Sequence, residues 1–347
     1  MGILSWLGLT DAVAIGSQPA SRGVVSPWAG PGQLAKVVID DIFGLDQTTV
    51  TRTMAMSVPA VAKARHLICT TLSRQPLRAY KNGEPLREQP SWLTRTDTGE
   101  PPRLRMLWTL DDLFFSGWSL WAVNRGAEGQ ILDARRVPLH LWGFDAEWQV
   151  IVGDRHPDAD EVVLIPGIGE GLLVEANRTI RGAIDLENQW AARVKNPVPV
   201  VELRYTGDED LTSAEMRQIR DTYVEARSDD NGVVMVTPRG FEVHAHGDQA
   251  LELFVNGRNA ASLDVARYAN LPATAADAST VNASSVNYQN NDVKRNELHD
   301  YTFRGWAMPV EERLSMDDCV PRGQTVAFDL SALTQMPDPG TGPRLED

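Results

Sequence analysis

The sequence has few cysteines and few basic residues for its length. Its 347 residues include only two cysteines, Cys69 and Cys319, which excludes a disulfide scaffold and a four-cysteine zinc site. We expect both to be buried thiols of a protein from a reducing compartment. Lysine and arginine number 33 against 47 acidic residues, giving a net charge of −14. General nucleic-acid binders carry a basic surplus, so this class is excluded.

Long apolar runs are also missing. No uninterrupted apolar stretch approaches the ~18 residues that a membrane span needs, and we expect no membrane partner. Residues 1–9 are apolar but hold no basic residue, so they indicate a packing or docking segment rather than a signal peptide. The remaining composition is ordinary for a globular protein, with 42% hydrophobic and 23% charged residues, which excludes wholesale disorder.

The first half of the chain predicts an arm followed by a mixed domain. Residues 1–56 show little periodicity, which is typical of a loosely attached arm. From residue 57, apolar residues at helical spacing predict a helix that Pro76 ends, and a second predicted helix ends at Gly117. Strands are predicted at 77–80, 119–125, 130–137, 139–144, 148–152 and 161–165. We therefore expect an α+β domain over 57–181.

The second half predicts two helices that flank a small module. The flanking helices are predicted at 182–194 and 248–269. Between them, residues 197–247 predict a strand at 200–205, a helix that opens with the capping box Thr212–Glu215, and a hairpin of 233–237 with 241–246. Val201, Leu203 and Tyr205 share one strand face in a module too small for its own core, so we expect them at a subunit boundary.

An unusual stretch of small residues follows. Residues 271–285 contain one acidic residue and no lysine or arginine, and a loop of this length is usually functional or disordered. Residues 286–304 predict a long polar helix, and Pro309 is expected to break any helix that continues beyond it. A last strand is predicted at 325–330, and a frayed tail at 336–347.

Charge is distributed unevenly along the chain. Residues 52–105 hold ten basic and four acidic side chains, a net of +6, which leaves −20 for the rest. This stretch indicates either a solvated basic face or a contact surface for nucleic acid or an acidic partner.

Motifs for chemistry are weak. Residues 167–171 read Gly-Ile-Gly-Glu-Gly, but no lysine with Ser or Thr follows as in a phosphate-binding loop, so a flexible connection is favoured over a nucleotide site. His244 and His246 share one strand face, yet no third ligand lies nearby in the sequence. We favour a solvent or interface face there over a metal site, and we expect no cofactor.

Adjacent acidic residues occur four times, at Asp40–Asp41, Asp111–Asp112, Asp229–Asp230 and Asp317–Asp318. Paired carboxylates serve two-metal nucleases, but we expect these at helix starts and turns, where Asp caps backbone amides. No nucleophile elbow is present. A metal-dependent nuclease or transferase of a mobile element using the paired acids remains the alternative to a non-enzymatic protein.

The order of these elements, with several short strings, resembles the portal protein of tailed double-stranded DNA bacteriophages, in the branch with shorter chains. The strings are residues 58–68, 75–80, 115–121, 211–223, 231–236, 248–252 and 266–272. The resemblance covers about residues 57–333. Two features depart from it: the C-terminal helical crown of larger portals is expected to be small or missing, and the loop 272–285 has no basic residue.

The resemblance implies an α+β portal architecture in a ring-forming oligomer. The first domain (57–181), completed by residues 286–335, would form an α/β wing. The stem would be helices 182–196 and 248–270, the clip would be 197–247, and the tunnel loop would be 271–285. Clip residues Val201, Leu203, Tyr205, Val233 and Phe241 would lie at a subunit interface, and the loop residues Pro272, Thr274, Asp277, Thr280, Asn282 and Ser284 would face the channel.

The resemblance also implies the partners and the place of action. A homododecamer would sit at one capsid vertex of the virion, after assembly in the host cytoplasm, and pass double-stranded DNA during packaging and ejection. Its partners would be the terminase large subunit, a head-completion or adaptor protein, and the major capsid or scaffolding protein. An acidic channel suits such transit, because tight phosphate contacts would stall the DNA. A different ring-forming head–tail adaptor is a further alternative.

Overall fold

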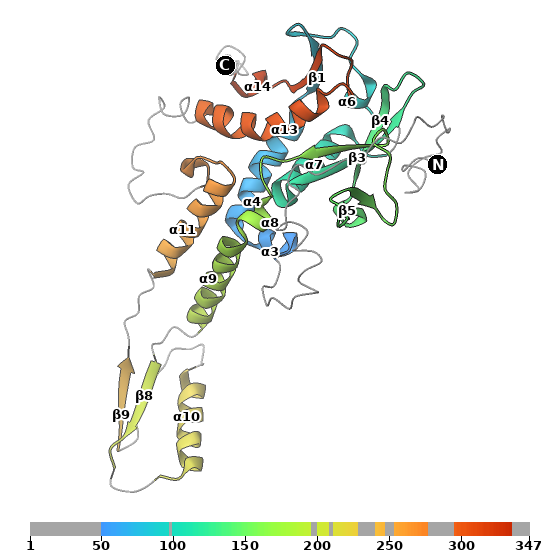
Figure 1. Ribbon diagram of the computed structural model, residues 1–347. Helices are drawn as coiled ribbons and strands as arrows, with labels where there is room; N and C mark the ends of the chain where they lie inside the picture. Colours follow the sequence, from blue (N-terminus) through green and yellow to red (C-terminus); the bar gives the residue numbers. More distant parts are fainter. Residues whose placement is uncertain are drawn as a thin grey trace, which may run out of the picture. The chain divides into compact units, whose positions relative to one another are not determined.

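The computed structural model describes residues 50–96, 99–195, 200–207, 211–227, 240–246, 253–276 and 295–334. The chain divides into two compact units (Figure 1). Unit 1 comprises Met1–Ile184 and Asn259–Asp347, and unit 2 comprises Asp185–Arg258. Helices and strands are mixed in both units, which confirms the α+β class. None of the described helices combines the length and apolar character needed to cross a membrane.

The described part of unit 1 begins with a helical run of four segments: α3 (Arg52–Ser57), α4 (Pro59–Arg65), the π-helical η2 (His66–Thr70) and α5 (Thr71–Arg74). The expected arm over 1–56 is therefore wrong at its end, because α3 is ordered and Val50 and Ala55 are buried in the core. Thr51 caps α3 by accepting a hydrogen bond from the Met54 amide. A six-residue helix is too short to show a periodic apolar stripe, so the sequence pattern missed it.

Two three-stranded antiparallel sheets follow the helical run. In the first, β1 (Leu77–Lys81) lies between β2 (Glu84–Pro85) and β10 (Gln324–Phe328), with Leu77 opposite Phe328. In the second, β3 (Trp118–Arg125) lies between β4 (Ile131–Val137) and β7 (Val162–Pro166). The first sheet thus pairs β1 with β10, a strand far away in the sequence. The last predicted strand is confirmed as β10, at one edge of this sheet.

The predicted strands over 139–144 and 148–152 are each partly wrong. Residues Leu139–Leu141 form the 3-10 helix η3, and only Trp142–Phe144 form a strand, β5, which pairs with β6 (Val150–Val152). Trp148 has φ 62° and belongs to the connecting turn. The Asp145 carboxylate accepts hydrogen bonds from the amides of residues 147 and 149 there, an Asx-type arrangement that outweighs the β propensity of tryptophan.

Helix α7 (Pro102–Ser116) lies in the main hydrophobic core of unit 1. The short helices α6 (Ser91–Thr94) and α8 (Leu172–Glu175) lie before and after it in the chain, and both contribute buried side chains to that core. Inside the core, the rings of Trp92 and Trp121 meet edge to face at 6.4 Å.

The C-terminal part of unit 1 corrects the expected break at Pro309. The π-helical η5 (Leu298–Phe303) continues into α13 (Arg304–Leu314), which contains Pro309 in its interior. Pro309 is buried beside Ala307 and Val310, and this burial offsets the loss of one backbone hydrogen bond. The short helix α14 (Ser331–Thr334) follows β10. Residues 286–294 of the predicted polar helix lie outside the described residues.

Two long helices each run from one unit into the other: α9 (Asn177–Lys195) and α11 (Leu253–Tyr268). Helix α9 starts five residues before the predicted position 182, and Ile180 and Ala183 are buried in unit 1. In α11, Val265 is buried and Val255 is 57% exposed. Val255 lies in unit 2 and Val265 in unit 1, so the described apolar residues of this helix are buried only at its unit 1 end.

Candidate functional site

The small module of unit 2 is a two-stranded sheet with one helix. Strand β8 (Val200–Tyr205) pairs with β9 (Phe241–His246), and helix α10 (Ser213–Arg227) lies between them in sequence. The capping box is confirmed, because Glu215 accepts hydrogen bonds from both the amide and the hydroxyl of Thr212. Residues 233–237 of the expected hairpin lie outside the described residues.

The strand register gathers the predicted apolar residues on one face. Leu203 lies opposite Val243, and Tyr205 lies opposite Phe241 with the two rings 5.0 Å apart. In the same register, Val201 pairs with Ala245. The other face carries the pairs Glu202 with His244 and Arg204 with Glu242. Of the predicted interface residues, Val233 lies outside the described part of the chain.

Within the described part of the chain, this apolar face is only partly covered. Val243 is 39% exposed, and Leu203, Tyr205 and Phe241 are only partly buried. More generally, none of the side chains whose burial is described between Asp185 and Arg258 is buried. Two-stranded sheets without a covered apolar face are marginally stable in water. The described part of unit 2 therefore lacks a core of its own.

The two helix segments that belong to unit 2 contact each other through an exposed cluster. The Arg258 guanidinium lies 5.2 Å from the ring centre of Trp190 and 3.4 Å from the Glu187 carboxylate. A Cβ at Gly257 would lie 3.0 Å from a methyl carbon of Leu186, so glycine permits this close approach. Trp190 nevertheless stays 40% exposed.

His244 faces solvent on β9, and its Nε2 lies 3.3 Å from the Glu242 carboxylate. For His246 only the backbone is described. Throughout the described residues, no three His, Cys, Asp or Glu side chains come together as a metal-ligand set.

The residues just before the predicted tunnel loop are bonded in unit 1 to η5 and α13, which follow the loop in the chain. We define the clamp as Asn270, Thr302 and Trp306. The Asn270 side-chain amide donates to the Tyr301 carbonyl, the Thr302 hydroxyl donates to the Asn270 carbonyl, and the Trp306 indole donates to the Ala269 carbonyl, at 2.6, 2.6 and 2.9 Å. Sequence reasoning missed this clamp, because its bonds join residues more than 30 positions apart.

The first residues of the loop are part of the fold. Pro272 is half-buried, and Thr274 belongs to the 3-10 helix η4 (Ala273–Ala276). Ala275 packs against the core, so the fold extends further into this stretch than its composition indicated. The other predicted channel residues lie outside the described residues: Asp277, Thr280, Asn282 and Ser284.

The acidic pairs that the structure describes are each held by arginines. On α7, Asp111 accepts hydrogen bonds from Arg52 at 2.7 Å and Arg65 at 2.5 Å, and Asp112 accepts from Arg136 at 2.6 Å and Ser119 at 2.9 Å. This corrects the expected position at helix starts and turns, because both residues lie within α7, buried in the unit.

Burial and hydrogen bonding act differently on the two carboxyl groups. Burial opposes ionisation of Asp111, but the hydrogen bonds from Arg52 and Arg65 outweigh it and hold its pKa below the usual value. Burial dominates at Asp112 and raises its pKa to about 6. Because arginines occupy these oxygens, they are not free to coordinate metal ions.

The second described pair, Asp317–Asp318, follows α13. Arg313 donates to Asp318 through both terminal nitrogens, at 2.9 and 2.7 Å. Asp317 lies 3.5 Å from Arg322. Asp40–Asp41 and Asp229–Asp230 lie outside the described residues.

Both cysteines are free and buried, as predicted. Burial raises the pKa of Cys69, and it raises that of Cys319 to about 12. Neither thiol is therefore a ready nucleophile.

The glycine-rich loop over 167–171 is packed, which corrects the expected flexible connection. The Gly167 amide donates to the Gly117 carbonyl at 2.7 Å, and the Glu170 amide donates to the Glu175 carboxylate at 2.8 Å. A Cβ on Gly171, which has φ 86°, would lie 2.5 Å from the Gly117 nitrogen. The glycines thus allow the backbone of this loop to contact the end of α7. The Glu170 amide donates its hydrogen bond to the Glu175 carboxylate, so it does not point to a phosphate site.

Comparisons with known proteins agree on one family. The family model described as phage portal protein matches residues 59–340. The crystal structure of an HK97 family phage portal protein from Corynebacterium diphtheriae is 32% identical, with a TM-score of 0.71, covering 85% of this chain and 100% of that one. A chain from the neck of a native gene transfer agent particle, computed with C12 symmetry, shares the fold at 14% identity and a TM-score of 0.56, covering 90% and 87%. No curated protein matches the sequence.

Proposed function

This chain belongs to the phage portal protein family, and we propose that its copies form a dodecameric ring at one capsid vertex, with a central channel for DNA packaging and ejection. The observation that carries this proposal is the absence of buried side chains in the described part of unit 2. An apolar face without cover in its own chain needs cover from another. Head-to-tail contacts repeated by rotation close into a ring.

We assign the parts of the ring as follows. Unit 1 supplies the wing, helices α9 and α11 supply the stem, and β8, α10 and β9 supply the clip. The apolar clip face of Leu203, Tyr205 and Phe241, extended by Val201 and Val233, packs against the neighbouring subunit. Among the described residues, strand β8 pairs with β9 alone, which leaves its second edge for addition to a neighbour's sheet. The clip tip meets the terminase large subunit and later a head-completion protein.

The loop that begins at Pro272 projects into the channel in this proposal. The clamp supports it, because it joins the residues just before the loop to η5 and α13, which follow the loop in the chain. Residues 271–285 contain no lysine or arginine. Thr274, Asp277, Thr280, Asn282 and Ser284 therefore contact DNA only through hydroxyl, amide or water-mediated bonds, and DNA can slide.

The ring is tested by one substitution in the clip face. Leu203→Asp places a carboxylate where burial is costly, so size-exclusion chromatography and negative-stain electron microscopy should show monomers in place of rings. Thr325→Asp, an exposed strand position of unit 1, is the matched control and should leave rings intact. Unchanged rings of the Leu203→Asp protein would contradict the clip interface, and rings missing from the parent protein would contradict the function.

The channel loop is tested by its length. Ala275 packs on the core, so a deletion should spare it and remove residues 279–284. Rings should still assemble, while packaged DNA per head falls or leaks out. Heads that fill and retain DNA normally would show that this loop is not a DNA-contacting element.

We also propose that the protein has no catalytic activity of its own. The described acidic pairs are held by Arg52, Arg65, Arg136, Arg313 and Arg322, which disfavours the nuclease alternative. Purified rings with Mg²⁺ or Mn²⁺ should neither cleave plasmid DNA nor hydrolyse ATP. Cleavage that disappears in an Asp318→Asn variant would overturn the proposal.

A further inference from the structure

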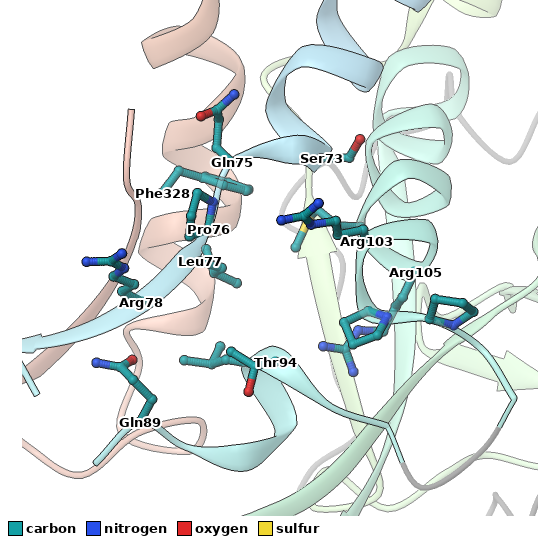
Figure 2. A pocket seen from close by; sticks show the side chains of 14 residues that line it. Ser73, Gln75, Pro76, Leu77, Arg78, Gln89, Thr94, Arg103, Arg105 and Phe328 are labelled. Carbon is teal, nitrogen blue, oxygen red and sulfur yellow. The ribbon is translucent and has the colours of Figure 1, made fainter. Parts of the chain in front are cut away.

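Unit 1 contains a pocket of about 540 Å³. Strand β1, helix α6, the first turn of α7 and the end of β10 surround it, and Figure 2 shows these elements around the open space. The pocket lies in the basic stretch of residues 52–105, whose role the proposed function does not explain.

The pocket combines an apolar wall with positive charge. Apolar side chains of Pro76, Leu77, Leu93, Met106 and Phe328 line it. Arg78, Arg103 and Arg105 also line it, and none of its described lining residues is acidic. A fitting occupant therefore carries carboxylates next to apolar side chains.

The three arginines differ in how many interactions they already make within the chain. Arg78 lies 3.4 Å from the Asp329 carboxylate. Arg105 is buried, and its guanidinium stacks over the Trp121 ring at 4.6 Å. It donates hydrogen bonds to the carbonyls of Trp92 and Ala134. Its Nε has no hydrogen-bond partner among the described residues. Burial lowers its pKa to about 10.

Arg103 is the arginine available to a ligand. It is exposed, and its side chain makes no ion pair with the described residues. Figure 2 shows it extending from α7 toward Pro76 and Leu77 across the pocket. A carboxylate placed there gains a charge-assisted hydrogen bond beside an apolar wall.

We infer that this pocket binds residues 37–46 of its own chain, which lie outside the described residues. Their sequence is Val-Val-Ile-Asp-Asp-Ile-Phe-Gly-Leu-Asp, and no lysine or arginine occurs between Lys36 and Arg52. The segment thus offers three carboxylates among six large apolar side chains, which complements the pocket in both respects. The pair Asp40–Asp41 is placed to meet Arg103.

The length of the connection permits this docking. Arg52 is bonded to Asp111 of α7, and Arg103 precedes Asp111 by eight residues, or about 12 Å along the helix. The chain is fixed from Val50 onward, and the seven residues from Val50 back to Phe43 span up to about 24 Å when extended. Phe43 and the pair Asp40–Asp41 before it therefore reach the pocket of the same chain.

Disulfide trapping in the full-length protein tests the inference. Phe43→Cys is combined with Thr94→Cys, which lies at the pocket (Figure 2), or with Glu84→Cys, an exposed control on β2. Cys69 and Cys319 are buried and should not react. Under mild oxidation, peptide mapping should show an intrachain disulfide with position 94 forming at least tenfold faster than with position 84. Equal rates, or disulfides between chains, would overturn the inference.

A charge swap separates specific docking from simple proximity. Arg103→Asp should slow the trapping at position 94 at least tenfold, and adding Asp40→Arg with Asp41→Arg should restore most of the rate. Unfolding curves of each variant confirm that the fold persists, since Arg103 is exposed. If trapping is unaffected and Arg103→Asp instead weakens binding of a fluorescent DNA duplex, the pocket is a phosphate site and the inference is wrong.

Discussion

In unit 1, buried apolar side chains form two clusters, the larger of which reaches from Val50 to Phe328, whereas no described side chain of unit 2 is buried. Both regions have regular helices and strands, so regular secondary structure alone does not indicate a self-sufficient domain. Burial of apolar area supplies most of the stabilising free energy. The comparison teaches that the described part of unit 1 contains a hydrophobic core of its own, whereas the described part of unit 2 contains none.

The largest expected effect comes from matched tryptophan substitutions in the two units. Trp121 is fully buried, and Trp190 is 40% exposed. Trp121→Ala should lower the free energy of unfolding of the monomer by about 3–5 kcal/mol because it leaves a core cavity. Trp190→Ala should lower it by less than about 1 kcal/mol. Urea unfolding followed by circular dichroism measures both, and similar losses would break the comparison.

The buried ion pair of Asp111 gives the next largest effect. Asp111→Asn removes the charge that Arg52 and Arg65 bind, and should cost about 3 kcal/mol at pH 7. The pKa of Asp111 in the folded protein is held below its usual value of 3.8. The greater stability of the parent over the variant is therefore fully present above about pH 4, and it is lost as the pH falls through the lowered pKa of the folded protein. Glu187→Gln, which weakens an exposed pair in unit 2, should change stability by less than about 0.5 kcal/mol.

The neighbouring Asp112 should behave in the opposite way with pH. Burial raises its pKa in the folded protein to about 6, against 3.8 ordinarily, so its charge opposes folding at pH 7. Asp112→Asn should therefore stay within about 1 kcal/mol of the parent at pH 7, because the amide still bonds Ser119. As the pH falls from 7 to 4, the folded parent takes up a proton and gains stability relative to the variant. A pH-independent difference in urea unfolding would contradict the shift.

Two glycines with similar backbone angles separate strain from packing in unit 1. Gly171 has φ 86° with Gly117 against it, and Gly129 has φ 83° with open space around it. Gly171→Ala should cost about 2–3 kcal/mol, from backbone strain and overpacking together. Gly129→Ala should cost about 1 kcal/mol, from strain alone. Thermal unfolding compares the two, and equal costs would show that the loop is not tightly packed.

The smallest effect is expected in unit 2, at the capping box. Thr212→Ala removes the hydroxyl that bonds Glu215. Amides of α10 should exchange with solvent about two- to fivefold faster, while the unfolding midpoint of unit 1 stays unchanged. Hydrogen exchange with mass spectrometry resolves the two regions. A shift in the unit 1 midpoint would mean that the two units are energetically coupled.

Periodic patterns predicted most of the described elements. The positive φ of Gly117 and of Gly83 marks an end of a helix and a turn, and both follow from glycine's conformational freedom. The strands β8 and β9 and the apolar face of β8 were also predictable, because alternation along a strand is a local property, but their pairing with each other was not predicted.

The features that sequence reasoning missed depend on contacts between distant residues. The partner of Asp111 is Arg52, 59 positions away, and no local pattern announces such a pair. Pro309 continues a helix because surrounding core residues bury it, so tertiary packing overrides its helix-breaking tendency. The glycines of 167–171 serve contact with Gly117, which only the folded structure brings near.

Because the clamp joins the two sides of the segment between η4 and η5, the length of this segment limits how far it can extend from unit 1. Eighteen residues, 277–294, lie between Ala276 and Arg295. Because the clamp bonds Asn270 to Tyr301 on the two sides of this segment, the segment can extend by at most about half its contour length, or about 30 Å. Each inserted pair of residues adds about 3.4 Å to that limit. In the ring that we propose, insertion or deletion here would therefore change how far the segment extends into the channel, without redesign of the surrounding core.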